Sequence, residues 1–179
     1  MHNFSLLQYI ESNSDQMTMQ QTAVEYGDQR TGILGQPAML SLLAHADSTS
    51  IVHRGVFVSK QFMCSGFPPP PDLIPQLDSV DTQGKNAREQ LAELTSASGC
   101  IECHKFIDPV GATFEHFDTI GRARLQDDLG AMVDASSQIY SRFTGEIDGT
   151  YNGLKELNDY LATLDSVKNC FVSQYLTYA

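Results

Sequence analysis

The chain has 179 residues, enough for one domain that buries a hydrophobic core, or one domain with an extension. Its formal net charge of −11 argues against nucleic acid as a partner, since the phosphates would repel it. No apolar run is long enough to predict a transmembrane segment, and an acidic surface suits a basic protein partner as well as plain solubility.

The first part of the chain is predicted to be helical. Residues 1–30 are polar and indicate an N-terminal remnant or extension without a recognisable export signal. Residues 31–66 form a helical segment, in which Pro37 suits the first position of one helix and Ser50 or Thr49 the N-cap of the next.

A proline run divides the chain. Residues 67–81 contain "GFPPPPDLIP", which cannot continue a helix and predicts a polyproline strap or spacer. Residues 82–179 follow as the second folded part, and their first helix is expected to be capped by Thr82 or Gly84.

The stretch "SGCIECHKFIDPVGATFEHFD", residues 98–118, contains the motif Cys-X-X-Cys-His. Cys100, Cys103 and His104 share one face of a helical turn, and this spacing is typical of covalent haem c attachment. Zinc would need a fourth ligand, and the other two cysteines, Cys64 and Cys170, do not form a second spaced pair. The motif therefore predicts one haem c, with zinc or a plain structural turn as alternatives.

After this motif we expect a loop region, then short structural elements. Residues 129–150 are predicted to form turns and two short strands, around Val133 and Ile139. A helix is predicted to follow over residues 149–164. A last helix is expected from Asp165 as N-cap. Its inward face would carry Val167, Cys170, Phe171 and Tyr175. This order is that of a small cytochrome c domain, in which the first and last helices cross.

Five short motifs occur in one order: "HRGVFV", "PPPPD", "CIECHKFIDPVG", "FEHFD" and "GRAR". With them, residues 26–179 resemble the C-terminal part of planctomycete-type cytochrome c domain proteins, which are large exported bacterial proteins. The resemblance implies Cys100 and Cys103 as the thioether attachments and His104 as the proximal iron ligand. Because haem c is attached outside the bacterial cytoplasm, we expect the periplasm or the extracytoplasmic face of the envelope.

Residues near the motif have expected roles. The carbonyl of Pro109, or of another residue in the expected loop, could accept the Nδ1–H of His104, although Pro109 could equally just shape that loop. Arg122 and Arg124 could bind the haem propionates, or form ordinary ion pairs, for example with Asp118.

The sequence leaves three possibilities for the sixth iron ligand. No Met follows Met132, so the distal Met that small cytochromes usually supply before their last helix is missing. His53, a polar ring in an apolar run, is the first candidate and Met132 the second. An open distal site is the third possibility.

The two remaining cysteines form an even pair. In an oxidising compartment Cys64 and Cys170 are expected to form a disulfide, and two separately buried thiols are the alternative.

The sequence thus predicts a mostly α, small cytochrome c-like domain around one covalent haem, with an N-terminal helical extension and a polyproline strap. The expected function is electron transfer to redox partner proteins, within a larger exported redox assembly at the membrane or envelope. A peroxidase-like haem enzyme with an open distal site, and a haem-stabilised structural module, are the alternatives.

Overall fold

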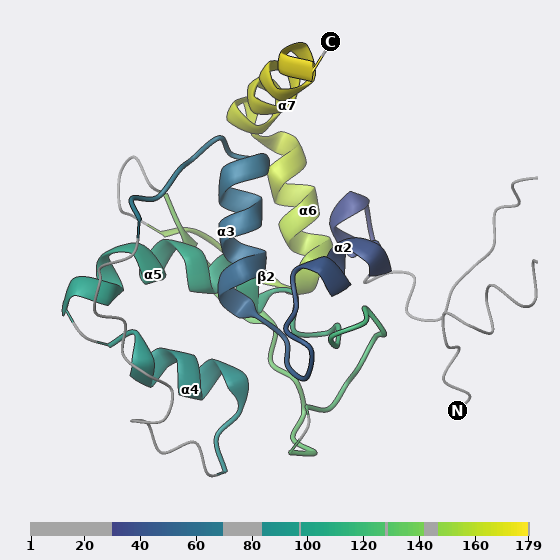
Figure 1. Ribbon diagram of the computed structural model, residues 1–179, viewed down its shortest axis with the longest axis vertical. Helices are drawn as coiled ribbons and strands as arrows, with labels where there is room; N and C mark the ends of the chain where they lie inside the picture. The colour runs from purple at the N-terminus through teal and green to yellow at the C-terminus, as the bar shows by residue number, and fades with distance from the viewer. Residues whose placement is uncertain (1–29, 70–83, 97, 128, 142–146, 179) are drawn as a thin grey trace, which may run out of the picture.

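The computed structural model describes residues 30–69, 84–96, 98–127, 129–141 and 147–178. Roughly half of these residues are helical, and two strands pair into a small sheet (Figure 1). The elements in chain order are the 3-10 helix η1 (Ile33–Gly35), α2 (Pro37–Leu42), α3 (Ile51–Gln61), α4 (Ala87–Leu94), α5 (Ser98–Ala112), β1 (Ser136–Tyr140), β2 (Ile147–Asn152), α6 (Gly153–Thr163) and α7 (Asp165–Tyr178).

The starts of the first two α-helices follow the sequence prediction. Pro37 is the first residue of α2, where its missing N–H costs nothing. Ser50 caps α3, because its side chain accepts the backbone N–H of His53 at 3.2 Å. Thr49 is not the cap and instead donates its hydroxyl to Glu115 Oε2 at 3.2 Å.

The predicted cap of α4 is wrong. Asn86 is the N-cap and forms a capping box with Glu89: each side chain accepts the other's backbone N–H at 2.9 Å. Gly84 lies in a turn before the helix, and Thr82 falls outside the described residues, as does most of the proline strap.

Helix α5 carries the whole Cys-X-X-Cys-His motif and continues through Pro109 to Ala112. The loop expected directly after His104 is therefore absent, and that prediction is wrong. A proline inside a helix removes one backbone hydrogen bond but fixes its own φ near the helical value, so a helix that is packed by its neighbours can tolerate it.

The sheet is antiparallel and pairs Ser136 with Asn152 at its open end. The strand predicted around Ile139 is confirmed as β1. Val133 lies outside both strands and only donates its N–H to Leu125 O at 2.9 Å. The helix expected from residue 149 starts at Gly153, because residues 147–152 pair with β1 instead.

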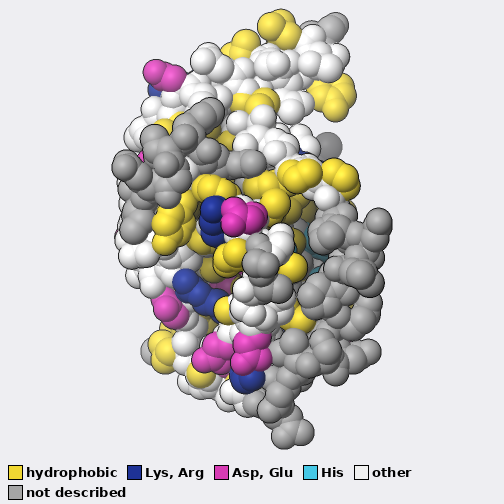
Figure 2. All heavy atoms as spheres, turned by 90° about the vertical axis from the view of Figure 1, so that its left-hand side faces the viewer, with side chains coloured by type: hydrophobic (Ala, Val, Ile, Leu, Met, Phe, Trp, Pro, Cys, Tyr) yellow, Lys and Arg dark blue, Asp and Glu magenta, His cyan; other side chains and the backbone are white. Residues whose placement is uncertain are grey.

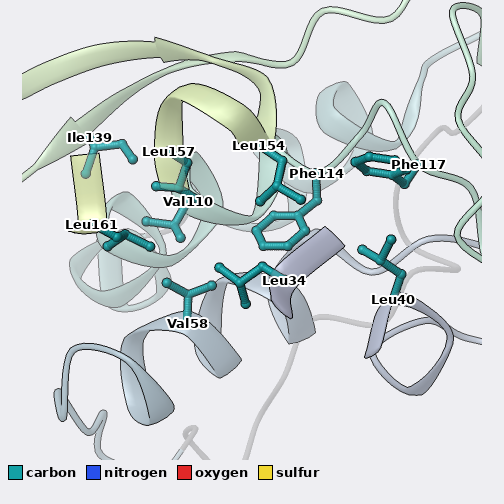
Figure 3. Close-up of a cluster of buried hydrophobic side chains, with 10 residues drawn as sticks. All are labelled: Leu34, Leu40, Val58, Val110, Phe114, Phe117, Ile139, Leu154, Leu157 and Leu161. Atoms are coloured by element: carbon teal, nitrogen blue, oxygen red, sulfur yellow. The ribbon is translucent and has the colours of Figure 1, made fainter. Parts of the chain in front are cut away.

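One hydrophobic core joins the two parts of the chain that flank the proline strap (Figure 3). Its buried members come from η1, α2, α3, α5, β1, α6 and the segment after α5. They are Leu34, Leu40, Val58, Val110, Phe114, Phe117, Ile139, Leu154, Leu157 and Leu161. Residues 31–66 therefore pack as part of the same body as the elements that follow the strap.

Helices α3 and α5 approach each other closely at two glycines. A Cβ at Gly55 would overlap the carbonyl oxygen of Ile107, and a Cβ at Gly111 would overlap that of Ile51. Only glycine leaves room for these backbones, so the two positions fix how α5 lies on α3.

The side chain of Arg54 is fully buried beside this contact. Its Nη1 donates to the carbonyls of Phe114 and Phe117 at 3.1 Å each, and its Nη2 to that of Asp118 at 3.0 Å. Glu115 lies 3.5 Å from Nη1 as counter-charge. Burial lowers the pKa of Arg54 to about 10, which leaves the guanidinium charged at neutral pH.

Helix α7 projects from one end of the molecule (Figure 1). Asp165 is its first residue rather than the cap before it, and Cys170 forms the predicted disulfide with Cys64. The predicted inward face is only half correct, because Phe171 and Tyr175 are 67% and 68% exposed. Figure 2 shows separate hydrophobic side chains exposed at this upper end, among atoms of other kinds.

The predicted crossing of the first and last helices of residues 82–179 is wrong. Figure 1 places α4 and α7 at opposite ends of the molecule, with α3 and α6 between them. The partner of α5 in the core is α3, from the segment before the proline strap.

Candidate functional site

Helix α5 brings together the three residues of the Cys-X-X-Cys-His motif. Cys100, Cys103 and His104 lie within one helical turn and are all partly exposed. Neither thiol is in a disulfide, so both are available for chemistry. Because positions i, i+3 and i+4 share a helix face, both sulfurs and the imidazole project to the same side of α5.

The His104 ring has a carboxylate partner. Its Nδ1 lies 2.8 Å from Asp108 Oδ1, one helical turn further on, and the two side chains are 24% and 21% exposed. Since a carboxylate only accepts, the neutral ring carries its proton on Nδ1 and keeps the lone pair on Nε2. A ring held in this way is ready to bind a metal ion through Nε2.

Asp108 takes the role expected of Pro109, so that prediction is wrong. Pro109 lies inside α5, and the partner of Nδ1 is the side chain before it rather than a loop carbonyl. The i, i+4 spacing of His104 and Asp108 was visible in the sequence. That spacing brings the two side chains together only in a helix, and the sequence predicts a loop there.

A groove of about 240 Å³ runs between α4 and α5 beside His104. It is lined mainly by apolar side chains, among them Ile51, Leu91 and Ile101, together with His104 and Asp108. Cys100 and Cys103 are not among its lining residues, so the thiols lie outside the groove.

Both arginines predicted near the propionates have carboxylate partners. Arg122 Nε lies 2.7 Å from Asp118 Oδ2, and Arg124 Nη2 lies 2.8 Å from Glu115 Oε2. The structure therefore contains the ordinary ion pairs that were the alternative. A role in binding propionates stays a prediction for both residues.

The structure does not bring either candidate sixth ligand to His104. His53 is exposed on α3, where its ring lies 4.9 Å from that of His45, and it does not line the groove. Met132 is 69% exposed and lines a second cavity, of about 380 Å³, between the start of α4 and the segment after α5.

The described residues do not offer a conventional metal-ion site. In the five described ranges, no group of three or more His, Cys, Asp or Glu side chains is arranged to hold a metal ion. In the same ranges, no helix is long and apolar enough to cross a membrane.

Two features of the site region were missed in the sequence: the Asp108 partner of His104, and the buried pair of Arg54 and Glu115. The second joins two of the five motifs, since Arg54 belongs to "HRGVFV" and Glu115 to "FEHFD". The order of these motifs in the sequence does not indicate that they touch.

Comparison with known proteins gives one family. The sequence model of the protein family PSCyt3, which is described as a protein of unknown function (DUF1588), matches residues 30–127. This range runs from the segment before η1 to beyond α5. No curated protein and no solved structure matches the chain. The match includes Arg54, the cysteine motif, Asp108 and Glu115 and covers more than half of the chain. The chain therefore belongs to the PSCyt3 family, a domain family associated with planctomycete-type cytochromes c.

Proposed function

We propose that this protein carries one covalent haem c on Cys100, Cys103 and His104 and serves as an electron carrier in an exported bacterial redox assembly. The observation that carries the proposal is the arrangement on α5. Two unpaired thiols and an imidazole project from one helical turn, and a carboxylate already anchors the imidazole at 2.8 Å.

The attachment residues suit this group. Both cysteine residues are partly exposed, which leaves room for a vinyl group to approach, and Nε2 is the ring nitrogen left for iron. When bound, the haem would supply a one-electron couple. The groove of about 240 Å³ is below the range of about 300–1,000 Å³ of ordinary ligand pockets, so it can enclose only part of a macrocycle.

A peroxidase-like activity is the second candidate, and one observation favours it. Among the described residues, His104 is the only His or Met that lines the groove. An iron without a second strong protein ligand keeps a position open for peroxide, whereas an electron carrier usually has both axial positions filled.

Mass spectrometry tests the proposal. The full chain, produced in a bacterial host with c-type maturation, should gain the mass of one haem and give a pyridine haemochrome spectrum of haem c. Substituting both Cys100→Ala and Cys103→Ala should abolish the added mass. An unmodified wild-type mass, or stoichiometric zinc, would contradict the proposal.

The absorption spectrum separates the two candidate functions. Low-spin bands support electron transfer, and high-spin bands that change on adding peroxide support the enzyme. Because His53 is not among the residues that line the groove beside His104, His53→Ala should leave the spectrum unchanged. A conversion from low to high spin would instead show that His53 reaches the iron.

A further inference from the structure

The contact between His104 and Asp108 is unlike the other short ion pairs on helix surfaces. Lys155 and Asp159 also stand four residues apart, but their side chains are 47% and 65% exposed. His104 and Asp108 are about three-quarters covered and line an apolar groove, where a charge acts through less water.

The backbone that carries Asp108 is held in place. Its neighbour Ile107 is buried, and the carbonyl of Ile107 lies against Gly55 of α3. Pro109, on the other side, has its φ fixed by its own ring. The carboxylate is therefore presented to His104 from a rigid stretch of helix.

The cations near the groove have partners of their own. Lys105 lies 3.2 Å from Glu102, and Arg88 donates to the backbone carbonyl of Ser136 at 2.7 Å. Asp108 contacts the His104 ring at 2.8 Å, so its negative charge acts directly on that imidazole.

We propose that Asp108 is a positioning residue that fixes His104 as the Nδ1–H tautomer and strengthens Nε2 as an electron donor to iron. The consequence, which rests on the proposed function, is a lower reduction potential than a neutral backbone carbonyl would give. A full negative charge on the far side of the ring stabilises the more positive, oxidised iron over the reduced iron.

The first experiment is a redox titration of the haem-loaded full chain. Asp108→Asn keeps the shape of the side chain and removes its charge. At a fixed ambient potential it should raise the ratio of reduced to oxidised haem about tenfold, a change of the same order as the smaller effects that outer-sphere partners have on metal affinity. An unchanged ratio would overturn the proposal.

Glu102→Gln is the matched control. It also removes one negative charge from α5, two residues before His104, but Glu102 is exposed and paired with Lys105. It should change the ratio far less than Asp108→Asn. An equal change would mean that Asp108 acts only through the net charge and would overturn its positioning role.

The second experiment does not need haem. Nitrogen-15 NMR of the full chain without haem, at a pH where the ring is neutral, should show His104 with its proton on Nδ1. In Asp108→Ala the ring should shift toward a mixture of tautomers, whereas Glu102→Gln should keep the wild-type signal. A wild-type ring without preference for Nδ1–H would overturn the inference.

The two proposals fail in different ways. If the wild-type chain takes up no haem, the proposed function falls while the NMR result still tests the contact. If haem is attached but Asp108→Asn leaves the potential unchanged, the proposed function stands and the inference about Asp108 falls.

Discussion

At the scale of single residues, the buried Arg54 explains why two motifs far apart in the chain belong together. It holds the turn from Phe114 to Asp118 through three carbonyl oxygens and has Glu115 as counter-charge. A buried cation without such partners would be very unfavourable, so the turn and the arginine require each other.

Glu115→Gln tests this pair. It leaves Arg54 charged and buried without its carboxylate and also removes the charge that Arg124 contacts at 2.8 Å, so we expect the free energy of unfolding to fall by about 3 kcal/mol. This is the low end of the usual cost, because the three carbonyl acceptors remain. The free energy of unfolding is measured by urea denaturation, with circular dichroism as the signal.

Asp159→Asn is the control for that experiment. It removes a carboxylate from an exposed pair with Lys155 and should change the free energy of unfolding by less than about 1 kcal/mol. If both variants lose the same small amount, the pair of Arg54 and Glu115 contributes no more than a surface contact.

Residue spacing predicted some of these roles and not others. Helical periodicity alone predicts that Cys100, Cys103 and His104 share one face of a helix. It also predicts that Asp108 lies beside His104, once the helix is known to continue that far. The contact of Arg54 with Glu115 is set by packing between distant segments, which periodicity does not describe.

At the scale of elements, the close approach of α3 and α5 depends on two backbone contacts, beside the core side chains that the two helices share. Gly55→Ala should place a methyl group against the carbonyl of Ile107, which belongs to the backbone and cannot rotate away. We expect a loss of more than about 2 kcal/mol in the free energy of unfolding, as for other overpacked sites.

Gly99→Ala is the matched control in α5 itself. No heavy atom lies within 4 Å of a Cβ at Gly99, and alanine favours a helix over glycine, by up to about 1 kcal/mol. It should therefore be neutral or stabilising in the same urea unfolding measurement. A loss as large as that of Gly55→Ala would show that the close contact is not the cause.

The disulfide is a second determinant at this scale, because it ties α7 to the end of α3. Cys170 is buried, while Phe171, Tyr175 and Leu176 of the same helix are exposed. Replacing Cys64 and Cys170 by serine should reduce the free energy of unfolding by up to about 4–5 kcal/mol, since the bridge closes a loop of 106 residues.

Hydrogen exchange of the backbone amides tests which helices the disulfide stabilises. Without it, the amides of α7 should exchange faster, while those of α3 and α6 keep most of their protection through the hydrophobic core. Unchanged exchange in α7 would mean that its other contacts suffice to hold it.

The elements themselves were predictable where a local signal marks them. Pro37 and Ser50 mark the starts of α2 and α3 through capping chemistry that depends on neighbours in the sequence. Strand β2 was missed because its residues continue into the pattern of α6, and only pairing with β1 separates the two. The continuation of α5 through Pro109 likewise depends on its packing against α3.

At the scale of the whole molecule, the order of helices did not predict their arrangement. The order resembles that of a small cytochrome c, yet α4 and α7 lie at opposite ends and α3 packs on α5 (Figure 1). Helices pack where close approach is possible, and here Gly55 and Gly111 provide it. The elements before the proline strap are thus part of the body that holds the Cys-X-X-Cys-His motif.

The charge of the whole molecule gives a last prediction, which applies to the haem-loaded chain. The sequence has 22 acidic and 11 basic residues, so its long-range field attracts cations and repels anions.

Oxidation by a cationic reagent, hexaammineruthenium(III), should slow by about tenfold between roughly 10 mM and 1 M salt, as the screening length falls from about 30 Å to about 3 Å. Oxidation by anionic ferricyanide should become faster over the same range, and an uncharged quinone should react at a nearly constant rate. Stopped-flow absorbance at the haem band measures all three. If the two charged reagents respond to salt in the same direction, the field at the electron-transfer surface does not follow the net charge, and the expectation of a basic partner protein is wrong.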